Sequence, residues 1–339
     1  MNLITEPENI EKKKWSDFVM NHPNGNIFQT PAIFDLYDKT PKYETVFCAA
    51  LDSRNEIVGL NLAIIQKEHF GIFGQLSARS IIWGGPLIKE ENPEVLDLLL
   101  RKYKEQIHDK AIYTQFRNLW QWSASERSVF ENNSYEYIDH LDILIDLKID
   151  ENKLFNNFHS GRRKNIRRAE RIPLVFEQVV DASEIKQCEL LVKETYKRVK
   201  LPCPDKSFFD NAKTNLCENG MSKIFAVKYQ DQIISCRYEL CYKDLIYDWY
   251  AGTSETHLDK YPNDYLPWKI LQWAKENKYS TFDFGGAGKP NEPYGVREYK
   301  LKFGGELVNY GRFEAIHKPR LMKLGKLGFI IYKKINGLR

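Results

Sequence analysis

The pattern of hydrophobic and polar positions predicts the same series of elements twice along the chain. Apolar runs at 45–50 and 57–65 flank a polar turn, and together they indicate a β-hairpin. The runs at 223–229 and 233–240 indicate a second hairpin, with Gln230 and Asp231 at its turn. Each hairpin is followed by a strand region and then by an amphipathic helix.

The two helices share helical spacing of their apolar residues, at 93–108 and at 265–276. Each leads into a short strand, at 111–116 and at 281–284. This repeated order predicts a duplicated α/β (α+β) module, in which each copy has a mixed central sheet flanked by helices. Further elements are expected in the second half: helices at 151–158, 161–171, 183–198 and 205–218, and a strand at 174–180.

The domain boundary is expected near 146–150, after a strand at 141–145. The predicted division is therefore a first domain at 1–148, a second domain with the active site at 149–316, and a basic tail at 317–339. The tail holds seven Lys and Arg and no acid, so the net charge of +4 leaves −3 for the rest of the chain. Its leucines and isoleucines suit either an anionic membrane surface or a helix that packs back on the fold.

Size and composition indicate an ordinary globular protein. A chain of 339 residues with 42% hydrophobic and 28% charged residues favours two packed domains. No apolar run approaches the roughly 20 residues that span a bilayer, and no signal peptide is evident, so a cytoplasmic protein is expected. The six cysteines and seven histidines lack metal-binding or disulfide spacing, so no metal site is predicted.

The segment 279–306 carries the most specific pattern in the chain. It is expected to form a strand, a glycine-rich turn at Gly285-Gly286, a loop, and a second strand carrying Lys300 and Lys302. A tight turn with solvated lysines is the plainer interpretation. The ordered spacing of Tyr299-Lys300, Phe303 and the following glycines favours a site for polar substrates instead.

A basic segment at 160–171 begins the second half, with six Lys and Arg and one acid. Arg162 and Arg163 lie in the first helical turn, where the helix dipole disfavours cations. Four basic residues fall on one helical face: Lys164, Arg167, Arg168 and Arg171. Two interpretations stay open, a site for a phosphate-bearing ligand and a solvated charged helix.

The segment 249–264 joins a strand to a helix N-terminus, where Asn263 or Asp264 would cap the helix. Tyr250 and Tyr265 either line a pocket there or fill the core. Asp283 ends a strand before the Gly-Gly turn and is either a general base or an acceptor of loop N–H groups; the structural role is favoured.

These motifs resemble the FemABX-like branch of the GNAT acyltransferase superfamily. The resemblance rests on FDFGG followed by YKLKFGG, on RRKNIRRAER and NDYLPWKILQWA, and in the first half on NIFQTPAIFDLY and IIWGGPLI. It implies two tandem GNAT-like domains and transfer of an acyl or aminoacyl group to an amine. The implied acceptor is a phosphate-bearing envelope precursor of peptidoglycan or polysaccharide.

The resemblance also implies roles for individual residues. Lys300 matches the catalytic lysine, which would stabilise the tetrahedral oxyanion, and Tyr299 replaces the more usual Phe. Arg163 and Arg167 match basic positions that meet substrate phosphate. The substrate-binding set expected from motif and position is Arg163, Arg167, Tyr250, Asn263, Tyr265, Asp283, Gly285, Gly286 and Phe303.

The donor is left open by the sequence. The chain lacks the coiled-coil arm of members that use aminoacyl-tRNA, and it also lacks the pyrophosphate loop of members that use acyl-CoA. Either is expected as a co-substrate, with no tightly bound cofactor. The rival hypotheses are a nucleic-acid-binding module at 164–171, although no DNA partner is expected, and a scaffold that contacts an anionic membrane through 317–339.

Overall fold

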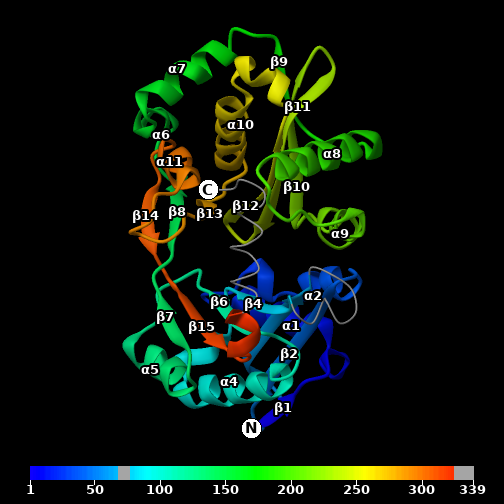
Figure 1. Ribbon diagram of the computed structural model, residues 1–339, viewed down its shortest axis with the longest axis vertical. Coiled ribbons are helices and arrows are strands. Elements are labelled where there is room, and N and C mark those ends of the chain that lie inside the picture. The colour runs from blue at the N-terminus through cyan, green and yellow to red at the C-terminus, as the bar shows by residue number, and fades with distance from the viewer. Residues whose placement is uncertain (68–76, 324–339) are drawn as a thin grey trace. The chain divides into compact units, whose positions relative to one another are not determined.

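The computed structural model describes residues 1–67 and 77–323 (Figure 1). The chain divides into two compact units: Met1–Asp139 joined by the chain from Tyr310 onward, and His140–Asn309. This division differs from the predicted boundary at 148. The strand β8 (Leu141–Asp146) belongs to the second unit because it pairs with β13 and β14, whereas β15 (Arg312–Ile316) returns to the first unit to pair with β6 and β7.

The first unit is built on one mixed sheet, in the order β1-β2-β3-β4-β6-β15-β7, with β5 paired to β3. The predicted first hairpin is confirmed by the antiparallel pairing of β2 and β3. The other strand bounds in this sheet are β1 (Asn2–Ile4), β2 (Tyr43–Leu51), β3 (Ile57–Gln66), β4 (Arg79–Trp83), β5 (Leu87–Ile88), β6 (Tyr113–Arg117) and β7 (Glu136–Ile138).

Helices cover both faces of this sheet: α1 (Lys12–Asn21), α2 (Pro31–Asp38), α4 (Pro93–Ile107) and α5 (Ala124–Asn132). The predicted helix α4 begins at Asn92, whose side chain accepts the N–H groups of Glu94 and Val95. Its apolar stripe, including Leu99 and Tyr103, is fully buried against the sheet. The opposite face is packed by α1 and α2, where Trp15 contacts Phe47 with ring centroids 4.4 Å apart.

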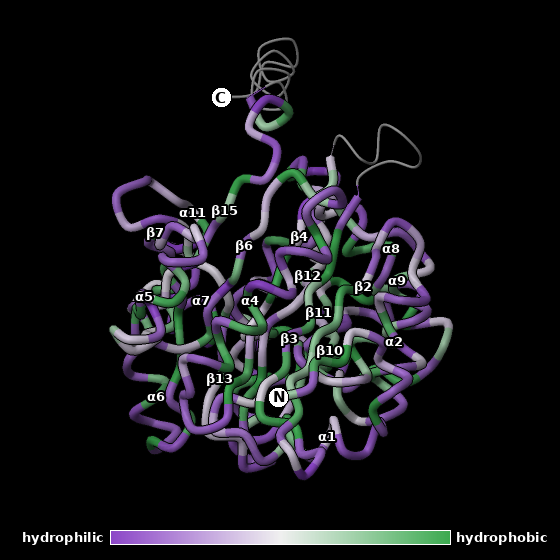
Figure 2. The backbone as a smooth tube through the Cα atoms, turned by 90° about the horizontal axis from the view of Figure 1, so that it is seen from below, coloured by the Kyte–Doolittle hydropathy of each residue, from purple (hydrophilic) through white to green (hydrophobic). Residues whose placement is uncertain are grey.

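The second unit repeats this plan, with the strand order β14-β8-β13-β12-β11-β10-β9. The second predicted hairpin is confirmed by β10 and β11, along which Figure 2 shows hydrophobic stretches. The strand bounds are β9 (Leu174–Gln178), β10 (Ser222–Tyr229), β11 (Gln232–Tyr242), β12 (Leu245–Thr253), β13 (Thr281–Gly286) and β14 (Glu306–Asn309).

The helices of the second unit are α6 (Glu151–Asn157), α7 (Ser160–Ala169), α8 (Ala182–Arg198), α9 (Lys206–Ala212), α10 (Pro262–Glu276) and α11 (Gly295–Leu301). Figure 1 shows α8 and α9 on one side of the sheet and α10 on the other. The core lies between α10 and the sheet and includes Phe225, Leu266, Phe282 and Phe303. The predicted fold class, two mixed sheets flanked by helices, is confirmed.

Two further expectations concern membranes: the absence of a membrane-spanning segment and the basic tail. Within the described residues, no helix is both long enough and apolar enough to cross a bilayer. The tail predicted at 317–339 lies mostly outside the described residues, so its contact with a membrane stays a prediction.

Candidate active site

The site is formed where two parallel strands of the second unit separate. β12 and β13 pair only at Leu245↔Thr281, Ile246↔Phe282 and Tyr247↔Asp283, although β12 continues to Thr253 and β13 to Gly286. Beyond Asp283, the β13 carbonyls that face β12 therefore lose their ladder partners. Ligands of α/β sheets commonly bind outside the carboxyl ends of strands that diverge in this way.

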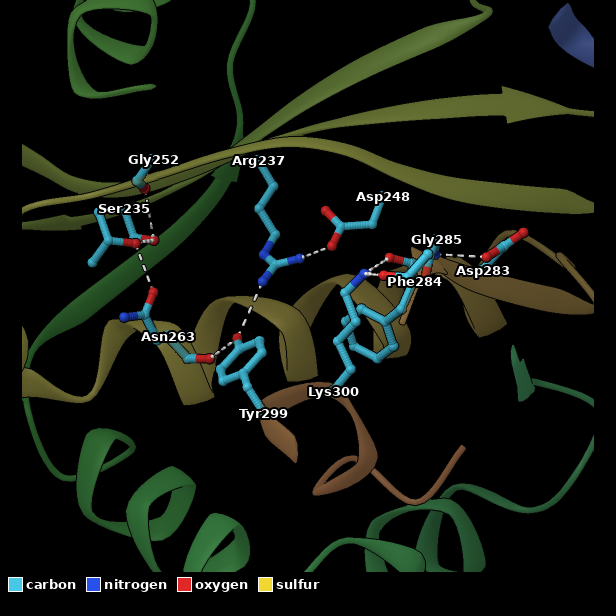
Figure 3. A network of polar contacts seen from close by, with 12 residues as sticks. Ser235, Arg237, Asp248, Gly252, Asn263, Asp283, Phe284, Gly285, Tyr299 and Lys300 are labelled. Carbon is cyan, nitrogen blue, oxygen red and sulfur yellow. Dashed lines mark hydrogen bonds and ion pairs between the residues drawn. The ribbon is translucent and has the colours of Figure 1, made fainter. Parts of the chain in front are cut away.

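Lys300 supplies the missing partners. Its Nζ donates to the carbonyl oxygens of Phe284 (2.5 Å), Gly285 (3.1 Å) and Gly286 (2.9 Å), as Figure 3 shows. Burial lowers the pKa of Lys300, and the carboxyl group of Asp248 acts in the opposite direction. The structure therefore places the predicted catalytic ammonium against the Gly-Gly turn, with all three N–H groups engaged.

The element that carries Lys300 was predicted wrongly. A strand was expected, but Lys300 lies on the helix α11, and Lys302 is the C-cap residue of this helix. The Tyr299 ring on α11 contacts the ring of Phe303, which lies just beyond the end of this helix; the ring centroids are 5.6 Å apart, and both rings pack in the core. The preceding Gly285 has φ +69°, and a Cβ there would lie 2.9 Å from the Tyr247 hydroxyl oxygen, so this turn requires glycine.

Tyr299 connects the lysine to a residue that sequence reasoning missed. Its hydroxyl group donates to the carbonyl oxygen of Asn263 (2.7 Å) and accepts from Arg237 Nη2 (3.1 Å). Arg237 is 6% exposed and forms an ion pair with Asp248 (Figure 3). The available signal was a pair of charged residues, Arg237 and Glu239, inside a strand whose pattern predicts burial, ISCRYELC.

Glu239 was missed for the same reason. It is fully buried on β11, opposite Asp248 in the antiparallel register, next to a bulge between Tyr238 and Glu239. Neither of its carboxyl oxygens, nor Oδ1 of Asp248, has a hydrogen-bond partner in the described structure. Burial and, to a lesser extent, the neighbouring Asp248 raise the pKa of Glu239 well above its usual value, so this site favours the neutral carboxylic acid.

The basic helix α7 presents a different arginine from the two that the resemblance selected. Arg162 is 8% exposed, forms an ion pair with Asp264, and donates to the Tyr299 carbonyl oxygen at 3.1 Å. Arg163 instead donates to the carbonyl oxygens of Asn156 and Phe158, just before α7. The guanidinium group of Arg167 lies over the Phe155 ring, 5.5 Å from its centroid. Arg162 is therefore the basic residue of α7 that contacts Tyr299 and Asp264.

The remaining predicted residues fall into two groups. Phe303 lies beside the site in the core, and Asn263 accepts a hydrogen bond from Thr253 at 2.6 Å. Asp283 accepts the Gly285 N–H at 2.6 Å, which matches the structural role favoured from the sequence. Burial and the nearby Asp142 raise the pKa of Asp283 well above its usual value.

Two predicted tyrosines contact other parts of the unit. Tyr250 packs against the rings of Tyr196 and Phe208, and Tyr265 packs on the apolar core. The geometry described above does not bring either side chain to Lys300. Among the described residues, no group of three or more His, Cys, Asp and Glu is arranged to hold a metal ion.

Comparisons with known proteins show sequence and fold similarity to transferases of one kind. Residues 157–301 match the family model of the acetyltransferase (GNAT) domain. A lipid II:glycine glycyltransferase of Staphylococcus epidermidis is 20% identical over an alignment of 400 positions, which covers 94% of each chain.

Solved structures extend the similarity over both units. The crystal structure of FemX superposes with a TM-score of 0.74 at 18% identity, covering 96% of this chain and 99% of FemX. The structure of L-PGS from Bacillus licheniformis gives 0.57 at 17% identity, covering 91% and 93%. The predicted resemblance to the FemABX-like branch of the GNAT superfamily is confirmed by these matches.

Proposed function

We propose that the protein transfers an activated aminoacyl or acyl group to an amine of a phosphate-bearing envelope precursor, at the opening between β12 and β13. The observation that carries the proposal is the Lys300 ammonium group, held on the Gly-Gly turn beside the Tyr299–Arg237 pair. The similarity to a lipid II:glycine glycyltransferase supports a peptidoglycan precursor as the acceptor.

The reaction forms a C–N bond and breaks the C–O or C–S bond of the donor. The attacking nitrogen loses one proton, and the leaving oxygen or sulfur gains one. Negative charge develops on the carbonyl oxygen in between, and a preorganised donor that meets this charge typically contributes a 10²–10³-fold rate gain. Of the three contacts of Lys300, the one to Gly285 is the longest at 3.1 Å, and we assign this N–H to the oxyanion when substrate binds.

The basic face of α7 suits the phosphate of the acceptor. Lys164, Arg167, Arg168 and Arg171 are exposed, and Arg168 also donates to the Tyr261 hydroxyl at 3.1 Å, next to the start of α10. Exposed guanidinium groups bind phosphate oxygens with two N–H groups at a time. The donor is an ester, as in aminoacyl-tRNA, or a thioester, as in acyl-CoA. Lys300 would act in the same way on either, because both present an activated carbonyl group.

A donor and acceptor screen tests the proposal. Purified protein is incubated with glycyl-tRNA, acetyl-CoA or a longer acyl-CoA, and with lipid II or a UDP-linked muropeptide, and amide formation is followed by mass spectrometry. We expect one donor to give product and Lys300→Met to reduce turnover at least about 100-fold. The exposed neighbour provides the control, because Lys302→Met should retain activity. Equal turnover in Lys300→Met and in the wild type would refute the role of Lys300.

A further inference from the structure

A large cavity lies in the first unit, at the position that corresponds to the Lys300 site in the second. β4 and β6 are its parallel pair, with Trp83↔Arg117 as the last paired position. After this point the chain leaves β4 toward α4 and leaves β6 toward α5, as β12 and β13 lead to α10 and α11. The cavity of about 1100 Å³ is lined by both of these exits and by α1.

The lining of this cavity carries a net negative charge. Six carboxylates and three lysines line it, an excess of three negative charges, and no arginine does. Lys14 is already paired with Glu56 at 3.4 Å. His22 is not available as a cation, because it bonds the Ile88 carbonyl oxygen at 2.9 Å and accepts the Asn24 N–H at 3.1 Å. Such a wall disfavours phosphates and nucleotides and favours a cation.

Of the other five carboxylates, Glu126 is buried and accepts the Ser123 N–H in the capping box of α5, and the remaining four are exposed. Glu11, Asp17, Glu90 and Glu91 are exposed and form no ion pair among the described residues. Glu90 and Glu91 have φ of 56° and 52°, two consecutive left-handed positions without glycine. Strained backbone of this kind is concentrated at ligand sites.

Aromatic rings form the apolar part of the wall. Trp120 is half-buried and lies against Trp122, with ring centroids 4.9 Å apart. The indole N–H of Trp122 donates to Asn118 Oδ1 at 3.0 Å, which fixes the orientation of this ring. An indole face attracts an ammonium group, and the attraction adds to that of nearby carboxylates.

We propose that this cavity is a second binding site, and that it takes an organic cation with an ammonium group on an apolar body. The ammonium group lies between the indole of Trp120 and the carboxylates of Glu90 and Glu91, and the apolar body contacts Phe18 and Ile57. A lysine side chain of a peptide and a free alkyl diamine share this chemistry. The proposal concerns binding only and does not depend on the transfer reaction.

Calorimetric titration of the full chain tests the proposal with three probes: N-acetyl-lysine amide, cadaverine and the uncharged N-acetyl-norleucine amide. We expect saturable binding of at least one ammonium probe, about tenfold weaker binding of the norleucine probe, and weaker binding at high salt. Tighter binding of the lysine probe than of cadaverine would identify a peptide source, and the reverse would identify a free amine.

Variants locate the site. The double variant Glu90→Gln/Glu91→Gln and the single variant Trp120→Leu should each weaken binding about fivefold to tenfold. Glu131→Gln changes an exposed carboxylate of α5 outside the cavity and should leave binding unchanged. Circular dichroism checks that each variant is folded. Equal affinity for the lysine and norleucine probes, undiminished binding in the folded double variant, or no binding of either ammonium probe would overturn the proposal.

Discussion

The two units use different side chains to satisfy strand carbonyl groups that have no ladder partner. In each, two neighbouring strands part and leave carbonyl groups without ladder partners; in the second unit these are the parallel strands β12 and β13, and in the first they are the antiparallel strands β3 and β4. In the first unit the fully buried Gln29 bridges β3 and β4 beyond their last pair, Ile64↔Ile81: its amide donates to the carbonyl oxygens of Leu62 (3.1 Å) and Trp83 (2.8 Å) and accepts the Leu62 N–H at 2.8 Å. In the second unit the ammonium group of Lys300 bonds three successive carbonyls.

An amide group can support the fold through hydrogen bonds, whereas an ammonium group can also take part in the reaction through its charge. Both satisfy buried carbonyls, which would otherwise cost about 1–3 kcal/mol each. Only the ammonium group brings a full positive charge to a place where substrate negative charge can develop. The second unit also surrounds this charge with buried groups that can balance it, Asp142, Asp248 and Asp283. The duplicated fold therefore provides two similar openings, of which one has the charge that acyl transfer needs.

Exchanging the lysine for the group used in the first unit gives the largest expected effect. Lys300→Gln keeps hydrogen bonds to the turn but removes the charge, so we expect at least about a 100-fold loss of turnover. The loss of unfolding free energy should stay below about 1.5 kcal/mol, because an amide can still donate to the carbonyls. Turnover is measured with the donor found in the screen, and stability by urea unfolding. Retained turnover would show that hydrogen bonding alone is sufficient.

The reciprocal change in the first unit should affect stability only. Gln29→Leu removes three buried hydrogen bonds, and we expect the free energy of unfolding to fall by about 2–4 kcal/mol. Under conditions where the variant is folded, its turnover should equal that of the wild type. Urea unfolding measures the first quantity, with Gln232→Leu at an exposed position of β11 as the control. A loss of turnover in the folded variant would mean that the first opening also serves the reaction.

The sequence was sufficient for much of this comparison, because the relevant signals are local. The two hairpins and the helices α4 and α10 follow from periodicity, so the duplication was visible before the structure. Lys300 was selected by its motif and does lie at the strand opening. Its helix was mistaken for a strand because Tyr299-Lys300-Leu301 alternates apolar and charged residues, and α11 is too short, at Gly295–Leu301, to show a helical repeat of apolar residues.

The missed residues depend on contacts that no local pattern encodes. Arg237 and Tyr299 are 62 positions apart, and Arg162 and Asp264 are 102 apart. The motif pointed to Arg163 and Arg167, but the choice among neighbouring arginines depends on the turn at which α7 begins, since only Arg162 faces Asp264. The division into units differs from the predicted boundary for a similar reason, because β8 pairs with the distant strands β13 and β14 and β15 crosses back to the first sheet.

The smallest expected effect is on the pH dependence of stability, and it concerns the buried carboxyl group of Glu239 in the second unit. The pKa of Glu239 is raised in the folded protein by burial, so the folded state keeps this proton to a higher pH than the unfolded state does. The contribution of Glu239 to stability is therefore fully present at acidic pH, below its unfolded pKa, and is lost as the pH rises toward the folded value.

Glu239→Gln removes this titration while keeping the shape of the protonated acid. We expect the wild type to lose on the order of 1–2 kcal/mol more stability than the variant as the pH is raised from 5 to 9. Urea unfolding across this range measures the difference, and Glu298→Gln on the exposed side of α11 is the control. Parallel pH profiles for the wild type and Glu239→Gln would show that Glu239 is ionised in the folded protein. Arg237 would then balance two carboxylates, those of Asp248 and Glu239, and the buried network beside Tyr299 would carry one more negative charge.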